Sequence, residues 1–85
     1  MPKTIIVEIA QVGSSTSQAT ARSHTVLVDR PVERGGEDRG PQGGELLLVS
    51  LGGCFASTLL AAIRSREADV SDVRVAVTGT IGGVP

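Results

Sequence analysis

One uncharged stretch constrains the fold of this chain more than any other feature. Residues 46–63 contain eighteen residues without a charge, flanked by Glu45 and Arg64. An acid at the start of a helix and a base at its end suit the helix macrodipole. Because side chains three and four residues apart share a helix face, one face is apolar and the other is small and hydroxylic around Cys54. Since neither face is charged, we expect a long helix over residues 45–64 that is buried on nearly all sides.

Two adjacent glycines, Gly52 and Gly53, interrupt this helix just before the cysteine. Each costs about 1 kcal/mol relative to alanine inside a helix, so their presence predicts close packing of another backbone beside Cys54. A chain of 85 residues with one phenylalanine and no tyrosine or tryptophan has little surface with which to cover such a helix. We therefore expect a homodimer in which a second copy supplies the missing cover.

The segments around the helix have the alternating apolar pattern of β-strands. The strands before the helix are expected to pair as an antiparallel hairpin or a three-stranded meander. The fold class is then α+β, with residues 1–85 forming one domain. The predicted elements, in chain order, are a strand at 3–10, a turn at 12–17, strands at 18–22 and 24–29, a loop at 30–44, the helix at 45–64 and a strand at 73–81.

Composition narrows the function classes. Eight basic and nine acidic residues with one aromatic argue against nucleic-acid binding. One cysteine and one histidine argue against a metal site, and no Gly-Lys-Ser/Thr follows the glycine-rich loop, so no cofactor is expected. The lone thiol and the absence of a signal-peptide pattern favour the cytoplasm. Residues 46–63 only reach the lower length limit of a membrane span, which leaves a membrane-associated protein as the least favoured alternative.

Cys54 is the sharpest candidate for chemistry. A thiol becomes a nucleophile or redox centre when a nearby cation stabilises its thiolate, whereas a buried cysteine without one packs as a small hydrophobe. Glu45 lies nine residues earlier, about half a turn around the helix axis. It could hold an arginine near the helix start, or serve only as a favourable acid in the first turn. The spacing of the arginines selects none of the candidates, which are Arg22, Arg30, Arg34, Arg39 and Arg64.

A series of short motifs runs through the loop and the helix. In order they are His24-Thr-Val-Leu-Val-Asp-Arg-Pro31, Gly35-Gly36, Asp38-Arg-Gly-Pro41, Glu45-Leu-Leu-Leu and Leu51-Gly-Gly-Cys54. In this order and spacing the sequence resembles the OsmC/Ohr family, in particular its OsmC-like branch, over residues 3–81. The resemblance implies an intertwined α+β homodimer with the cysteine helices at its centre and active sites at the subunit interface.

The resemblance also implies an activity and roles for three residues. Cys54 matches the peroxidatic cysteine, which reduces organic hydroperoxides. Glu45 matches the glutamate of the OsmC-like pattern, although the best-known peroxidases hold their arginine from one residue earlier, where this chain has Gly44. Arg22 is the arginine available in the N-terminal strand region. The chain is expected to lack the family's C-terminal half with its second cysteine, and so to need an external thiol reductant. A non-catalytic module that binds a small ligand or a partner is the alternative.

Overall fold

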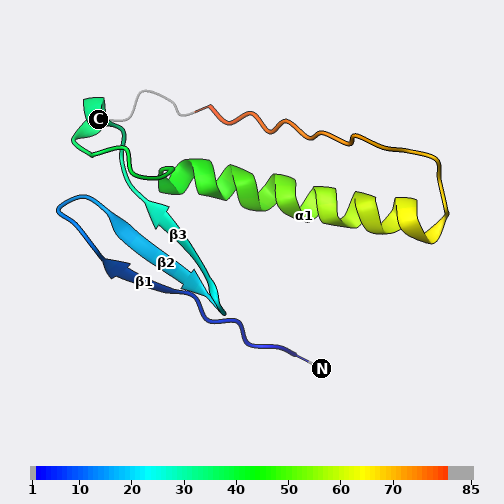
Figure 1. Cartoon of the computed structure of the whole chain (residues 1–85), viewed down its shortest axis with the longest axis horizontal. Helices are drawn as coiled ribbons and strands as arrows, with labels where there is room; N and C mark the ends of the chain where they lie inside the picture. The colour runs from blue at the N-terminus through cyan, green and yellow to red at the C-terminus, as the bar shows by residue number, and fades with distance from the viewer. Residues whose placement is uncertain (1, 81–85) are drawn as a thin grey trace. The chain divides into compact units, whose positions relative to one another are not determined.

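The computed structural model describes residues 2–80, and residues 1 and 81–85 lie outside this description. The described chain has three antiparallel strands followed by one long helix, which confirms the expected α+β class (Figure 1). It divides after Gly43 into two compact units, each described here by itself. The elements are β1 (Glu8–Gln11), β2 (Ser17–Ala21), β3 (His24–Val28), the 3-10 helix η1 (Val32–Arg34) and α1 (Gly43–Ser65).

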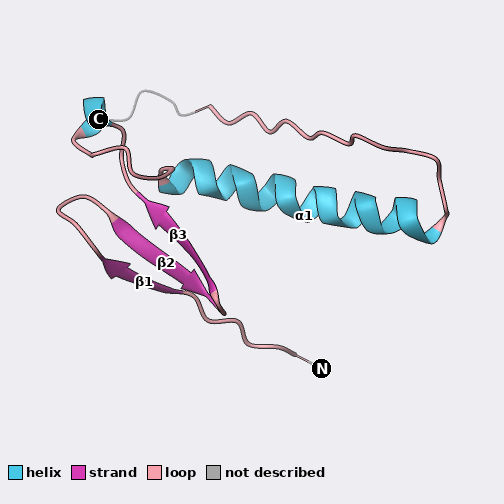
Figure 2. Cartoon of the chain, viewed as in Figure 1, coloured by secondary structure: helices cyan, strands magenta, loops and turns pink. Residues whose placement is uncertain are grey.

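The first unit is built on a three-stranded antiparallel meander in the order β1-β2-β3 (Figure 2). Glu8 pairs with Thr20 at one end of the β1–β2 ladder. The predicted strand at residues 3–10 is therefore too long, since strand β1 begins only at Glu8. The physical reason is the lack of a pairing partner: β2 ends at Ala21, and the chain turns at Arg22, whose φ is 57°.

Polar side chains, and no large apolar ones, fill the interior of the first unit. Thr16 and Asp29 are the buried side chains of the described residues, with 1% and 2% of their surfaces exposed. Thr16 lies in the turn between β1 and β2, and Asp29 directly follows β3. A hydrogen bond from Thr16 Oγ1 to Asp29 Oδ2, 2.8 Å long, joins the two. This unit is thus organised around a carboxylate and its donors.

The second unit contains the long helix predicted from the sequence. Helix α1 runs from Gly43 to Ser65 and has Glu45 in its first turn and Arg64 in its last. No residue of α1 is buried in the single chain, so the burial expected for this helix is not found within one subunit. The reason is the shortage of covering chain: the other described part of this unit is the single extended segment after the helix (Figure 1).

That extended segment differs from the strand predicted at 73–81. Residues 68–80 belong to no strand, the backbone turns at Asp72, whose φ is 57°, and residue 81 lies outside the described residues (Figure 2). A β-strand needs a hydrogen-bonded neighbour, and this segment packs against a helix, whose backbone groups are already paired. It runs back along α1, so that a Cβ at Gly79 would lie 3.0 Å from Leu48 Cδ1.

Candidate functional site

The thiol predicted to carry the chemistry lies on the central part of α1. Cys54 is a free, exposed cysteine in the single chain. Glu45 lies on the same helix, nine residues earlier, which corresponds to about 13.5 Å of rise and half a turn. The carboxylate and the thiol therefore leave the helix on opposite sides. Helix α1 does not bring them together directly, and any joint action needs a third group between them.

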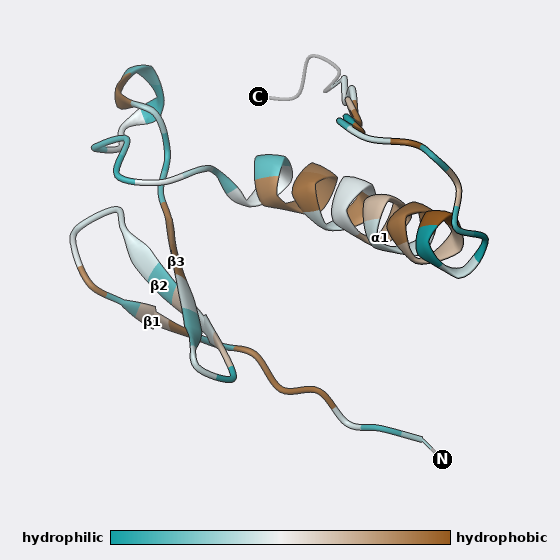
Figure 3. Ribbon diagram, turned by 45° about the vertical axis from the view of Figure 1, so that its right-hand side comes forward, coloured by the Kyte–Doolittle hydropathy of each residue, from teal (hydrophilic) through white to brown (hydrophobic). Residues whose placement is uncertain are grey.

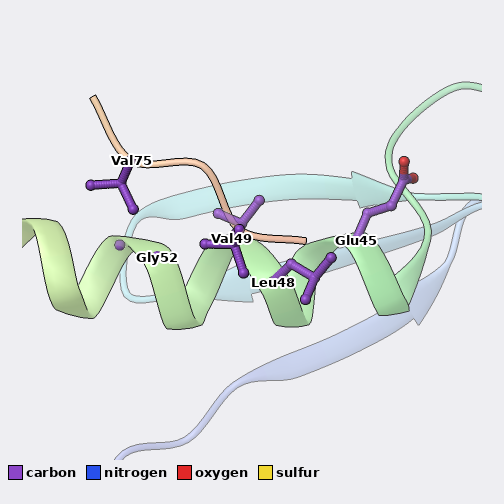
Figure 4. A pocket seen from close by; sticks show the side chains of 7 residues that line it. Glu45, Leu48, Val49, Gly52 and Val75 are labelled. Carbon is purple, nitrogen blue, oxygen red and sulfur yellow. The ribbon is translucent and has the colours of Figure 1, made fainter. Parts of the chain in front are cut away.

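A groove lies between the first half of α1 and the returning segment, and Cys54 is not among its lining residues (Figure 4). Its volume is about 480 Å³. Apolar side chains and glycines form most of its wall, and Glu45 is the charged residue of its lining. Such a surface accepts a hydrocarbon group. The lining residues are Glu45, Leu48, Val49, Gly52, Gly53, Val75 and Val77.

The two glycines that precede Cys54 have different surroundings. A Cβ at Gly52 would lie 2.8 Å from Val77 Cγ2, so the missing side chain lets the returning segment approach α1 closely. At Gly53 a Cβ would have nothing within 4 Å. The neighbour at Gly52 is thus a valine side chain of the chain's own returning segment, and the close backbone packing predicted beside Cys54 is not found in the single chain, where the thiol is exposed. The groove at this contact was not predicted, because the sequence does not reveal that the chain turns back along its own helix.

Much of the surface of α1 is apolar and open to solvent in the single chain (Figure 3). Leu47, Leu51 and Phe55 each expose 58–62% of their surface. Among the described residues, α1 is also the one helix long and apolar enough to cross a membrane by length and composition. The core helix of a soluble protein meets the same two criteria. Water is a poor environment for such a surface, so α1 requires further cover.

Arg22, the predicted activating cation, lies in the first unit. It occupies the turn between β2 and β3 and is exposed. Its role toward Cys54 stays a prediction. Another arginine of this unit, Arg39, is close to the β1–β2 turn, since a Cβ at Gly13 would lie 3.3 Å from Arg39 Nη1.

Sequence reasoning missed the cluster around Asp29. The Asp29 Oδ1 atom accepts a hydrogen bond of 2.7 Å from the N–H of Arg30. The Oδ2 atom accepts bonds of 3.3 Å and 3.2 Å from the N–H groups of Glu37 and Arg39, besides the Thr16 hydroxyl. A signal for this cluster was present in the sequence: an aspartate directly after a strand, followed by proline and a glycine-rich loop, is typical of a carboxylate that pairs with loop N–H groups.

These donors determine the ionisation of Asp29. Burial opposes the charged form and by itself raises the pKa of the carboxyl. The hydroxyl of Thr16, the nearby Ser15 and the N–H groups of Arg30 and Arg39 favour the carboxylate and outweigh burial, so the pKa of Asp29 lies well below its ordinary value. The Ser15 hydroxyl makes no hydrogen bond of its own.

Among residues 2–80, no three side chains of histidine, cysteine, aspartate or glutamate come together in an arrangement that could hold a metal ion.

Comparison with known proteins gives one match. Residues 35–84, more than half of the chain, match a family model described as OsmC-like protein. The match includes Glu45 and Cys54 and begins after Arg22. No curated protein and no solved structure matches the chain.

Proposed function

The chain belongs to the OsmC-like family, and from this premise we propose that it is a thiol-dependent peroxidase that reduces organic hydroperoxides at Cys54. The observation that carries the proposal is a free, exposed thiol on α1, within the segment that matches the family. The apolar wall of the groove along the same helix suits an organic substrate.

The reaction begins at the sulfur of Cys54. The thiolate attacks the distal oxygen of the hydroperoxide, the O–O bond breaks, and the alkoxide leaves with a proton as an alcohol. Cys54 is oxidised to the sulfenic acid by two electrons, and the peroxide is reduced. A thiol then condenses with the sulfenic acid to a mixed disulfide and releases water. A second thiol reduces that disulfide and restores Cys54. Since the 85 residues contain one cysteine, both thiols come from an external reductant.

Two charged residues complete the proposed site. Arg22 stabilises the thiolate and the negative charge that develops on the leaving oxygen. Glu45 binds the guanidinium of Arg22. This gives the Glu45 carboxylate a role in the site although it leaves the helix on the side opposite to Cys54. The exposed apolar surface of α1 supports a homodimer in which a second copy covers this helix. The unpaired thiol supports a cytoplasmic location.

Trapping of the sulfenic acid tests the proposal. Purified protein is mixed with cumene hydroperoxide in the presence of dimedone, and the product is analysed by mass spectrometry. One dimedone adduct on Cys54 is expected, with loss of one equivalent of peroxide. Cys54→Ser removes the adduct, and Ser57→Ala, which changes a hydroxyl one turn away on the same helix, retains it. A Cys54 that stays a free thiol with excess peroxide, yet is alkylated by iodoacetamide, contradicts the proposal.

A non-catalytic binding module is the second candidate, and the groove of about 480 Å³ is the observation that favours it. Its apolar wall suits a small apolar ligand or a partner. An unreactive thiol together with saturable binding of such a ligand would support this reading.

A further inference from the structure

The N-terminal arm, which we define as residues 2–7, leads into the outer strand of the meander. Strand β1 begins at Glu8 and pairs with β2 on one side, so its other side is an edge of the sheet (Figure 1). Within the described part of the chain, the arm forms no hydrogen bond. A row of N–H and C=O groups without partners, continuous with an edge strand, is a template for pairing with another strand.

The side chains of the arm are apolar and open to solvent. Ile5, Ile6 and Val7 expose 76%, 73% and 53% of their surfaces (Figure 3). Proteins commonly protect an edge with a proline, a bulge or a charge, and no proline or charge interrupts these three residues. The arm therefore has the apolar alternation of a strand and lacks only a neighbour.

The charges at the two ends of this segment favour a second copy of the same segment as that neighbour. Lys3 stands at its beginning, and Glu8 stands just after the arm. Two copies that run antiparallel bring the lysine end of each to the glutamate end of the other. Two parallel copies would place like charges side by side, which destabilises a strand pair. The segment is thus complementary to itself in the antiparallel direction.

The order of the side chains also selects a register. In a symmetric antiparallel pair, the residue on the two-fold axis faces itself, and residues equally far from the axis on its two sides face each other. With Ile6 on the axis, Ile5 faces Val7 of the second copy, and Thr4 faces Glu8 of the second copy. Apolar side chains then meet apolar ones, and a hydroxyl can donate to a carboxylate. An axis at Ile5 or at Val7 would place Thr4 or Glu8 opposite an isoleucine.

We propose that the N-terminal arm is a self-recognition edge, at which two copies pair antiparallel through residues 4–8 with Ile6 opposite Ile6. The pairing joins two meanders into one continuous sheet. It goes beyond the proposed function, because it involves neither Cys54 nor the cover expected for α1. A ribbon of five residues buries far less than the roughly 1,200 Å² of a standard interface, so the pairing is weak and forms at high protein concentration. A chain with two different self-contacts assembles beyond a dimer when it is concentrated.

Disulfide cross-linking of the full chain tests the register. Cys54→Ser removes the native thiol, and one cysteine is then introduced, as Ile6→Cys or as Ile5→Cys. Facing Cα atoms on the axis lie about 4.5–5.5 Å apart, within disulfide range. The two Cα atoms at position 5 lie about 8 Å apart, which is too far for a disulfide. Ile5 is the matched control, since it is an equally exposed isoleucine in the same arm. At millimolar concentration, Ile6→Cys is expected to give about 10-fold more linked dimer than Ile5→Cys.

Three results of this experiment would overturn the proposal: equal yields for the two variants, a higher yield for Ile5→Cys, or no linked dimer in either. The charges are tested in the same chain. Glu8→Lys is expected to lower the yield of Ile6→Cys several-fold, because it brings like charges together, and the further change Lys3→Glu is expected to restore it. A yield that Glu8→Lys leaves unchanged, or that Lys3→Glu does not restore, contradicts the antiparallel pairing.

Amide hydrogen exchange of the wild-type protein separates a second copy from another occupant of this edge. The amides of residues 5–7 are expected to exchange fast in dilute solution and more slowly as the protein is concentrated. Slow exchange that does not depend on concentration would show that another segment of the same chain covers the arm, and would overturn the proposal.

Discussion

The bond between Thr16 and Asp29 permits a quantitative prediction. Thr16→Val removes a hydroxyl that donates to a carboxylate at 2.8 Å and keeps the branched shape of a side chain that is 1% exposed. A hydrogen bond to a charged group contributes about 1.5–3 kcal/mol, and the near-isosteric replacement limits any loss of packing. We therefore expect the free energy of unfolding of the first unit to fall by about 2 kcal/mol, a change of about 30-fold in its equilibrium constant.

Urea denaturation followed by NMR amide signals of β2 and β3 measures this loss. With an m-value of about 1–2 kcal/mol/M for a small unit, the midpoint is expected to move down by about 1–2 M at constant m. Thr25→Val is the matched control, because it makes the same chemical change at an exposed position of β3. Surface substitutions of this kind change stability by at most about 0.5 kcal/mol. Equal midpoints for the wild-type protein and Thr16→Val would refute the reasoning, as would an equal loss in Thr25→Val.

Three further predictions concern acid stability, the helix glycines and assembly. The folded state holds the pKa of Asp29 well below its ordinary value of 3.8. The contribution of the Asp29 carboxylate to the free energy of unfolding is therefore complete above pH 3.8 and is lost as the pH falls further. Asp29→Asn is expected to flatten the acid limb of a stability–pH curve measured by circular dichroism. An acid limb as steep as in the wild-type protein would contradict this. Gly52→Ala is expected to stabilise the chain less than Gly53→Ala, because only the new Cβ at position 52 meets Val77. The midpoints of urea denaturation of the two variants measure this difference. Equal midpoints would argue against the contact with Val77. Sedimentation of the wild-type protein is expected to show a homodimer. Leu51→Glu is expected to dissociate this dimer, because it places a charge on an apolar helix surface that is exposed in the single chain. A well-folded wild-type monomer would exclude the dimer.

Local pattern was enough to predict most of the secondary structure. The uncharged run between an acid and a base predicted both ends of the helix to within two residues. This was possible because the hydrophobic periodicity and the preference of charges for the helix ends depend on residues close together in the sequence. The alternating strands and the polar turn predicted antiparallel pairing, as a hairpin or a three-stranded meander, and the structure has the meander. The predicted strands at 3–10 and 73–81 were wrong in extent or in kind. Their apolar alternation is real, but a strand also needs a partner edge, and this is a property of the whole fold.

For the candidate site, too, some features could be predicted from the sequence and others required the tertiary structure. Residue type and spacing singled out Cys54 and Glu45, and the family match includes both positions. Their roles, and that of Arg22, stay predictions. The groove along α1 and the cluster around Asp29 required the tertiary structure. Each depends on groups far apart in the sequence: Val77 against Gly52 in the first case, and the Thr16 hydroxyl against a carboxylate thirteen residues later in the second.

The sequence by itself therefore determined the antiparallel strands, the long helix after them, the candidate thiol and the family, because these depend on local periodicity and on motifs. The tertiary structure decided which backbone groups a buried carboxylate satisfies and which face of the helix the returning chain covers. Both depend on long-range packing, because a hydrogen-bond donor and an acceptor far apart in the sequence come within bonding distance only after the intervening chain has folded. The free surface that remains on α1 is the physical reason to expect a second subunit.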